Sequence, residues 1–123
     1  RDWIHVSDHV KALCGILASG TNGETYNIGG GNEISNIELV NSICDTVDEI
    51  LARKAGASRK LIQFVTDRLG HDFRYAIDSK KIMTQLGWQP KKEFKPSIEE
   101  TIQWYTDNTS WVETMLSKLE NNK

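Results

Sequence analysis

An α/β fold class is indicated by residues 24–31, ETYNIGGG, where β-favouring residues alternate as in a strand and three glycines follow. At the glycines the backbone can approach another group closely. A helix is predicted on each side of this strand, because apolar residues recur at helical spacing from Ser7 to Ala18 and again after Ser35. The first part of the chain therefore alternates helix, strand and helix.

The helix that follows the strand has the clearest local signal. Ser35 and Glu38 form an S-x-x-E capping box, in which each side chain accepts a hydrogen bond from the main-chain N–H of the other residue. The acidic residues Asp45, Asp48 and Glu49 are expected to face mainly solvent. The apolar side of the helix carries Ile37, Val40, Ile43, Val47 and Ile50.

Further along the chain, residues 61–65 (LIQFV) are predicted to form a second short strand that leads into a polar loop. Three more helices are expected. The first is capped by Asp78 and ended by Gly87, the second starts at another capping box at Ser97, and the third starts at Ser110. The polar residues 121–123 are expected to fray. The prediction as a whole is a few short strands with about five helices.

So few strands make a poor sheet by themselves, since such a sheet has open edges and little core to share. The chain also opens without Met, on residues that already approach a helix. We therefore expect a piece of a longer protein whose sheet neighbours are missing. Such a piece is expected to self-associate in order to cover the open edge.

The composition is that of an ordinary globular protein, with 123 residues, 38% hydrophobic, 26% charged and a formal net charge of −2. Charges of both signs are interleaved, which argues against a long nucleic acid as a partner and still allows a small anion to be bound. The longest apolar runs fall far short of the roughly 20 residues that span a bilayer, so we expect a cytoplasmic protein without membrane contact. Cys14 and Cys44 are predicted to be buried reduced thiols.

The best candidate site combines polar residues at the ends of elements. Asn36 lies in the first turn of a helix, where free amides and the helix dipole favour an anion such as phosphate, and Arg68 can chelate a second oxygen. The alternative is structural: Asp67 and Arg68 are then a surface ion pair, and the glycines are only a turn. The full candidate set is Arg1, the loop 29–31, Asn36 and the loop 67–71 with Asp67, Arg68 and His71.

Other chemistries find little support in the sequence. His5 and His9 are four residues apart but lack a third metal ligand. Neither cysteine has a nearby His, and no Ser lies in a G-x-S-x-G motif, so no nucleophile is predicted. The sequence also lacks a G-x-G-x-x-G after a strand, so the chain is not expected to hold a dinucleotide by itself.

Three segments, residues 1–9, 23–30 and 67–78, resemble the dTDP-glucose 4,6-dehydratases in order and spacing. Residues 86–90 (LGWQP) and 101–105 (TIQWY) extend the resemblance to about Trp111. Most of these segments are shared by other extended short-chain dehydrogenases that act on nucleotide sugars. Residues 67–78 (DRLGHDFRYAID) are characteristic of the dTDP-glucose enzymes, whereas GDP-mannose dehydratases and UDP-glucuronate decarboxylases differ there.

The resemblance implies that the chain is the carboxy-terminal, nucleotide-sugar-binding part of such an enzyme. Residues 1–31 would complete the edge of a Rossmann domain, and residues 32–123 would form the substrate domain. Matched residue by residue, Arg1, Asn36, Arg68 and His71 are expected to contact the diphosphate of a dTDP-sugar, with Asp67 in the same substrate-binding loop. Leu69 stands where the family commonly has Pro, which leaves this loop less preorganised.

In the full-length family enzyme, the implied reaction converts dTDP-glucose to dTDP-4-keto-6-deoxyglucose with NAD. The sugar is oxidised at C4, water is lost across C5 and C6, and the hydride returns to C6. The family's NAD loop and catalytic residues lie upstream of the matched segments, so we assign no catalytic residue and expect no NAD on this chain alone. A homo-oligomer, such as a dimer, is expected. Two other interpretations stay open: a free-standing nucleotide-sugar-binding module without catalysis, and a dimerisation piece with a decayed site.

Overall fold

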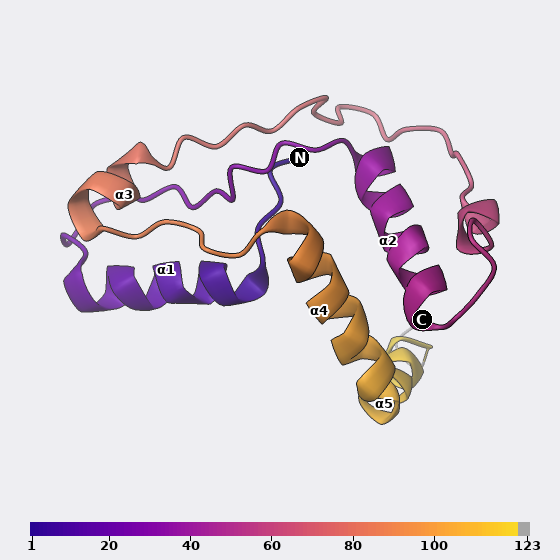
Figure 1. Cartoon of the computed structure of the whole chain (residues 1–123). Coiled ribbons are helices and arrows are strands. Elements are labelled where there is room, and N and C mark those ends of the chain that lie inside the picture. Colours follow the sequence, from indigo (N-terminus) through magenta and orange to yellow (C-terminus); the bar gives the residue numbers. More distant parts are fainter. Residues whose placement is uncertain (121–123) are drawn as a thin grey trace.

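The computed structural model describes residues 1–120, which form five α-helices, one 3-10 helix and long extended segments (Figure 1). The number of predicted helices is therefore confirmed over these residues. The fraying predicted at residues 121–123 lies outside them. The elements are α1 (Val6–Ser19), α2 (Asn36–Ile50), the 3-10 helix η1 (Ser58–Leu61), α3 (Lys80–Leu86), α4 (Phe94–Asp107) and α5 (Thr109–Glu120).

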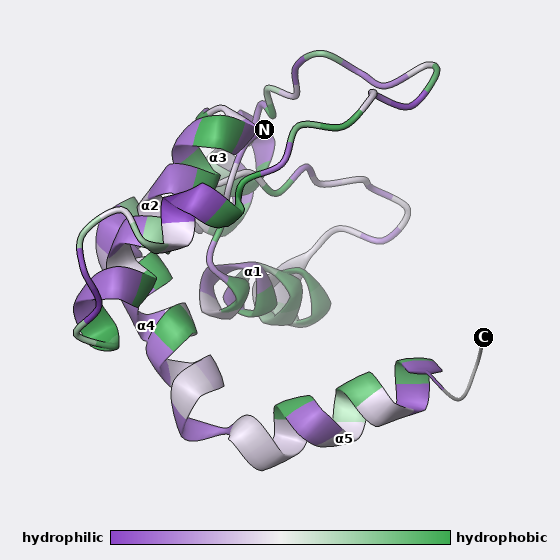
Figure 2. Cartoon of the chain, turned by 90° about the vertical axis from the view of Figure 1, so that its right-hand side faces the viewer, coloured by the Kyte–Doolittle hydropathy of each residue, from purple (hydrophilic) through white to green (hydrophobic). Residues whose placement is uncertain are grey.

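The helices gather at two ends of the molecule. At one end α1 packs against α3, and at the other α2 packs against α4 and η1 (Figure 1). Two extended segments, residues 20–35 and 62–79, run side by side between these ends. The Gly29 amide donates to the Ser79 hydroxyl at 2.8 Å, and Arg74 pairs with Glu33. The last helix, α5, packs on α4 and projects away from the other helices (Figure 2).

The two predicted strands are not formed. Residues 24–28 and 62–65 lie outside any helix, yet neither segment takes part in a β-ladder. Within residues 1–120 the only β-bridge is the isolated antiparallel one between Asp2 and Glu33. A strand is defined by hydrogen bonds to a neighbour in register, and residues 1–120 bring no such neighbour to either segment. The helical part of the predicted fold is thus confirmed, while its strands were wrong for this chain.

The start of α2 is as predicted, but its acidic side is not. The Ser35 hydroxyl accepts a hydrogen bond from the Glu38 amide at 3.3 Å, and the Glu38 carboxylate accepts one from the Ser35 amide at 3.0 Å. Asp48, expected to face solvent, is only 3% exposed. Its carboxylate accepts hydrogen bonds from the amide and the hydroxyl of Ser58, which joins the end of α2 to η1.

The end of α3 follows the predicted signal, whereas the N-cap residue is Ser79, one residue after the predicted cap Asp78. Asp78 accepts a hydrogen bond from the Lys80 amide at 2.9 Å, in the first turn of the helix. Gly87 follows the last helical residue with a φ of 63°, in the left-handed region that favours glycine. The helix is therefore bounded by local chemistry at both ends.

The start of α4 was predicted too late. The helix begins at Phe94, and Pro96 lies in its first turn, where a missing N–H costs no intrahelical hydrogen bond. Ser97 is consequently inside the helix, and its hydroxyl donates to the Glu93 carbonyl instead of capping. The last helix, α5, begins at Thr109, one residue before the predicted Ser110.

The buried carboxylate of Asp8 joins α1 to the segment before α4. Asp8 is 1% exposed, and its Oδ2 accepts hydrogen bonds from the amides of Lys91 and Lys92 at 2.8 Å each. The Trp88 indole donates to the Asp8 carbonyl at 3.2 Å. Burial raises the pKa of Asp8, but the two amides together with Lys11 outweigh this effect and hold the pKa below its ordinary value.

The apolar core of the described residues is small, and α1 carries an exposed apolar stripe. Leu17, for example, is 88% exposed. Cys14 on the same helix is also exposed, so the prediction that it is buried was wrong. No helix in residues 1–120 is both long and apolar enough to cross a membrane. The buried hydrophobic residues are Ala12, Ile82 and Ile98, and the stripe consists of Val6, Val10, Leu13 and Leu17.

Candidate functional site

The first residues of the chain pair in antiparallel fashion with the segment that leads into α2. Arg1 and Ile34 exchange two main-chain hydrogen bonds of 3.1 Å. The Asp2 carboxylate accepts hydrogen bonds from the amides of Gly30 at 3.1 Å and Asn32 at 3.0 Å. This pairing places Arg1 beside the first turn of α2.

The glycine loop at residues 29–31 serves this pairing. A Cβ on Gly30 would lie 2.1 Å from the Trp3 carbonyl oxygen, and one on Gly29 would lie 2.5 Å from an Asp2 carboxylate oxygen. The predicted close approach of the backbone is therefore confirmed. The approaching groups belong to this chain, however, and the loop is absent from the lining of the polar pocket described next.

A polar pocket of about 700 Å³ opens between the Arg1 segment, the start of α2 and the loop 67–75. Four of the five predicted substrate-binding residues line it: Arg1, Asn36, Asp67 and His71. The fold thus brings together positions that are far apart in the sequence. The other lining residues are Glu33, Ile34, Ser35, Ile37, Asp72, Phe73, Arg74 and Tyr75.

His71 bridges Asp67 and Arg1 in this pocket. Its Nδ1 lies 2.5 Å from Asp67 Oδ1, and its Nε2 contacts Nη2 of Arg1. Because a guanidinium group can only donate, Nε2 accepts here and the ring proton lies on Nδ1, from which it is donated to Asp67. The hydrogen bond from His71 lowers the pKa of Asp67, and so does the Arg68 amide. Asp67 therefore orients His71, which in turn orients Arg1.

Arg68 is the one predicted residue that does not line the pocket. It begins a tight turn, closed by a hydrogen bond from the His71 amide to the Arg68 carbonyl at 3.3 Å. Gly70, the third residue of this turn, has a φ of 69°, as a type II turn requires. The turn therefore presents His71 to the pocket while the exposed Arg68 lies at its first position.

The start of α2 contributes main-chain donors to the pocket. The capping box engages the amide of Glu38 but not those of Asn36 and Ile37. These two amides belong to the positive end of the helix dipole and can donate to a ligand. Glu38 opposes an incoming anion, because hydrogen bonds from Ser35 lower the pKa of its carboxyl group and keep it charged. Two cations line the pocket, Arg1 and Arg74, and Arg74 is paired with Glu33. The attraction of the pocket for an anion is therefore expected to come mainly from Arg1.

Sequence reasoning missed the other eight lining residues, and two of them, Tyr75 and Asp72, are linked to Arg1. The guanidinium carbon of Arg1 lies 4.5 Å from the centre of the Tyr75 ring, and the Tyr75 hydroxyl donates to Asp72 at 2.5 Å. The hydrogen bond to Asp72, together with the negative charge of that residue, raises the pKa of Tyr75. The sequence offered one indication of their role. Both residues lie in the segment 67–78, which is the part of the resemblance specific to the dTDP-glucose enzymes.

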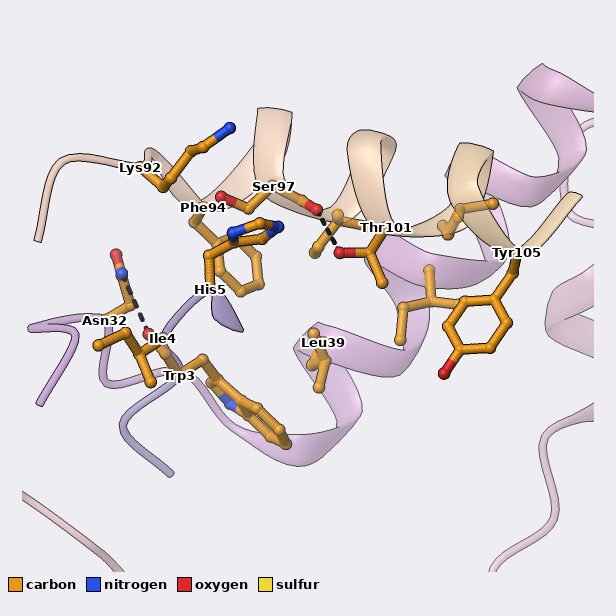
Figure 3. Close-up of a pocket in the computed structure, with 13 residues that line it drawn as sticks. Trp3, Ile4, His5, Asn32, Leu39, Lys92, Phe94, Ser97, Thr101 and Tyr105 are labelled. Atoms are coloured by element: carbon orange, nitrogen blue, oxygen red, sulfur yellow. Dashed lines mark hydrogen bonds between the residues drawn. The ribbon is translucent and has the colours of Figure 1, made fainter. Parts of the chain in front are cut away.

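A second pocket, of about 330 Å³, lies between α2 and α4 (Figure 3). Both pockets have volumes typical of small-molecule sites, so size does not distinguish them. The two pockets differ in the chemistry of their linings. The second pocket is mainly apolar and lacks the convergent charges of the polar pocket. Its residues include Trp3 and Ile4 from the first segment, Leu39 from α2, and Phe94, Ile98 and Tyr105 from α4.

Neither a metal site nor a dinucleotide site is built within residues 1–120. No group of three or more His, Cys, Asp or Glu side chains there is placed to hold a metal ion. His5 precedes α1 as predicted, where its Nδ1 accepts a hydrogen bond from the Ser7 amide. No strand in these residues leads through a glycine loop into a helix, and Asp2 and Trp3 occupy the space beside the existing loop. Residues 1–120 therefore do not form the strand, glycine loop and helix of a Rossmann dinucleotide site.

Comparison with known proteins relates the chain to enzymes that act on nucleotide sugars. The family model described as GDP-mannose 4,6 dehydratase matches residues 1–101. The dTDP-glucose 4,6-dehydratase of Shigella flexneri is 50% identical over 117 residues, which are 95% of this chain and 32% of that protein. The corresponding protein of Neisseria meningitidis is 48% identical over 120 residues, with coverage of 95% and 34%. The chain spans about a third of the length of these curated relatives.

Solved structures contain the same arrangement of elements. The dTDP-glucose 4,6-dehydratase of Bacillus anthracis, in complex with NAD, matches with a TM-score of 0.72 and 41% identity over 90% of this chain and 32% of that chain. DesIV, the dTDP-glucose 4,6-dehydratase of Streptomyces venezuelae with NAD and TYD bound, matches with a TM-score of 0.75 and 36% identity over the same shares. The fold described above therefore recurs within proteins about three times as long.

Proposed function

We propose a function from the premise that this chain belongs to the GDP-mannose 4,6-dehydratase family, whose model covers residues 1–101. Within that family the chain corresponds to the carboxy-terminal part of the dTDP-glucose 4,6-dehydratases. The proposed function is to bind the nucleotide-sugar substrate of such an enzyme. In the full-length enzyme this substrate is dTDP-glucose, and the product is dTDP-4-keto-6-deoxyglucose.

Two observations favour a thymidine nucleotide over the GDP sugar in the description of the family model. The segment 67–78 has the form characteristic of the dTDP-glucose enzymes, and it supplies His71 and Asp67 to the polar pocket. The curated relatives at 48–50% identity are also dTDP-glucose 4,6-dehydratases. Structures of the Streptomyces venezuelae relative hold dTDP-sugar ligands, which supports nucleotide-sugar binding by this part of the family.

The observation that carries the proposal is the convergence of Arg1, Asn36 and His71 on one pocket. A diphosphate is a doubly charged acceptor, and a guanidinium group beside a helix N-terminus supplies the donors that bind it. Asp67 holds His71 in place. Arg68 does not line the pocket, so its proposed contact with the diphosphate requires the exposed side chain to reach the ligand from the first position of the turn 68–71. The site therefore binds and orients the sugar donor.

The rest of the chain is divided as the family implies. Residues 1–31 complete the edge of the Rossmann domain, and residues 32–123 form the substrate domain. NAD supplies the hydride chemistry in the full-length enzyme, where residues outside this chain hold it. No residue of this chain is proposed to act in catalysis, so the isolated chain is expected to be inactive.

Isothermal titration of the chain with dTDP-glucose tests the proposal, with UDP-glucose as the comparison. We expect saturable binding that prefers the thymidine nucleotide. Arg1→Ala should weaken it by about 10- to 100-fold, since a hydrogen bond to a charged group contributes about 1.5–3 kcal/mol. Arg59→Ala is the matched control, because Arg59 on η1 carries the same charge and forms an exposed ion pair with Asp45 on α2.

Two outcomes would contradict the proposal. The first is the absence of saturable heat with a chain that circular dichroism shows to be folded. The second is an equal loss of affinity in the Arg1 and Arg59 variants. This result would show that binding is a general attraction between charges and not a contact with the pocket.

A further inference from the structure

We propose that Tyr75 is a positioning residue that holds Arg1 in the orientation required to bind a diphosphate. The inference rests on the proposed function, because it concerns the same pocket. Neither the family resemblance nor the sequence pattern assigned a role to Tyr75. The starting observation is geometric: the guanidinium carbon of Arg1 lies 4.5 Å from the centre of the Tyr75 ring.

Two contacts restrict the Arg1 side chain. The guanidinium carbon of Arg1 lies over the Tyr75 ring, and His71 Nε2 contacts Nη2 of the same group. A guanidinium group has five N–H donors, and neither a contact with an aromatic ring nor one acceptor, His71, uses all of them, so donors are left for a ligand. An otherwise flexible arginine is thereby ordered before the ligand arrives, which reduces the entropy cost of binding.

The hydroxyl group of Tyr75 has a second effect. It donates to Asp72 Oδ2 at 2.5 Å, and Asp72 lines the same pocket. This hydrogen bond restrains the position of the ring tip, and we propose that it also occupies a carboxylate that would otherwise compete with a phosphate for Arg1. The hydrogen bond to Asp72 and the negative charge of that residue also raise the pKa of Tyr75 above its ordinary value.

The ring and the hydroxyl therefore make separable contributions. Tyr75→Phe keeps the ring over Arg1 but releases Asp72, whereas Tyr75→Leu removes both contributions. Adding Asp72→Asn to Tyr75→Phe removes the released negative charge and should restore affinity. The chain also offers a matched control, since Lys81 lies 5.0 Å from the centre of the Tyr26 ring, outside the polar pocket.

The first experiment needs no ligand. In a two-dimensional NMR spectrum that detects arginine Nε–H groups, the Arg1 signal is identified by its loss in Arg1→Lys. Tyr75→Phe should leave this signal near its position, and Tyr75→Leu should move it because the ring current is lost. Tyr26→Leu should not affect it. An unchanged Arg1 signal in a folded Tyr75→Leu chain would overturn the proposed stacking.

The second experiment is titration with dTDP, followed by calorimetry. We expect Tyr75→Leu to weaken binding by about two- to five-fold, the range that corresponds to one cation–π contact. Tyr75→Phe should bind more weakly than the unchanged chain, and the double variant with Asp72→Asn should regain the loss. Unaltered affinity in Tyr75→Leu, while Arg1→Ala binds poorly, would overturn the role of Tyr75 and leave the proposed function standing. If the unchanged chain does not bind dTDP, the proposed function fails, and the NMR measurement still decides whether Tyr75 orders Arg1.

Discussion

Asp8 connects parts of the chain that are far apart. Its carboxylate accepts hydrogen bonds from the amides of Lys91 and Lys92, which lie 83 and 84 positions further along the chain. The other carboxylate oxygen, Oδ1, is buried and lies 3.6 Å from Lys11 Nζ. A buried charge is stable only when donors or opposite charges surround it. If the charged side chain is removed, those donors lose their hydrogen bonds. Asp8 is therefore a residue whose removal should loosen the packing of α1.

We predict that Asp8→Ala lowers the free energy of unfolding by about 2–3 kcal/mol, because it leaves two partly buried amides without an acceptor. Asp8→Asn should cost less, since its side-chain oxygen can still accept both hydrogen bonds. Urea unfolding followed by circular dichroism measures both changes. Equal losses in the two variants would show that the negative charge, and not the acceptor, is what matters.

The same residue should make stability depend on pH. The folded state holds the pKa of Asp8 below its ordinary value of 3.8, so the charged form is favoured by folding. This contribution is fully present above the ordinary pKa and is lost as the pH falls through the lower folded value. The stability difference between the unchanged chain and Asp8→Asn should therefore be constant near neutral pH and shrink in acid. A difference that grows below pH 4 would contradict this assignment.

The tight turn from Arg68 to His71 is the element whose sequence departs from the family. Leu69 occupies its second position, where the turn requires the φ near −60° that proline has built in. The Leu69 side chain is fully exposed, so its replacement loses no packing. The turn also sets the position of His71, which links its stiffness to the polar pocket.

We predict that Leu69→Pro raises the free energy of unfolding by about 0.4–1 kcal/mol, because it restricts the unfolded chain. It should also tighten binding of dTDP-glucose, since His71 and Arg68 flank the stiffened turn. Urea unfolding and calorimetric titration test the two effects. Leu69→Ala is the control, because it removes the same side chain without fixing φ. Lower stability of the proline variant than of the alanine variant would contradict the geometry of the turn.

The helices and the strands differ in how they depend on the rest of the molecule. The capping box at Ser35, the Asp78 interaction and the left-handed Gly87 act within one turn, so these boundaries formed within one residue of where the sequence predicted them. Residues 24–28 and 61–65 have strand-like composition but no partner in register, so no strand formed. Local hydrogen bonds can be predicted from neighbouring residues, whereas a ladder needs a second segment.

The whole molecule has little core of its own. Only three hydrophobic residues are buried among those described, while α1 displays the stripe of Val6, Val10, Leu13 and Leu17. Figure 2 shows this hydrophobic character along α1. We expect an exposed apolar stripe of this kind to be covered by another polypeptide. In the absence of another partner, a second copy of the chain is available to do so.

We predict that the isolated chain forms dimers or larger species at micromolar concentration. The double variant Leu13→Glu and Leu17→Glu should shift it toward monomer, because two charges then interrupt the stripe. Ala18→Glu, at an exposed position of α1 outside the stripe, should leave association unchanged. Sedimentation velocity distinguishes these outcomes. A clean monomer for the unchanged chain would show that neither the exposed stripe of α1 nor the open sheet edge expected from the sequence drives association.

The sequence by itself determined the family of this chain, the approximate places of its five helices, and four of the residues that line the polar pocket. These features depend on local capping, helical periodicity and motifs read along the chain. Only the tertiary structure decided that Arg1 meets His71 across 70 positions, that Tyr75 lies under Arg1, and that Asp8 and Asp48 are buried. It also decided that the two segments predicted as strands form no β-ladder and that Cys14 is exposed. The reason is that burial, pairing and long-range contact depend on which distant segments pack together, and the spacing of neighbouring residues does not contain that information.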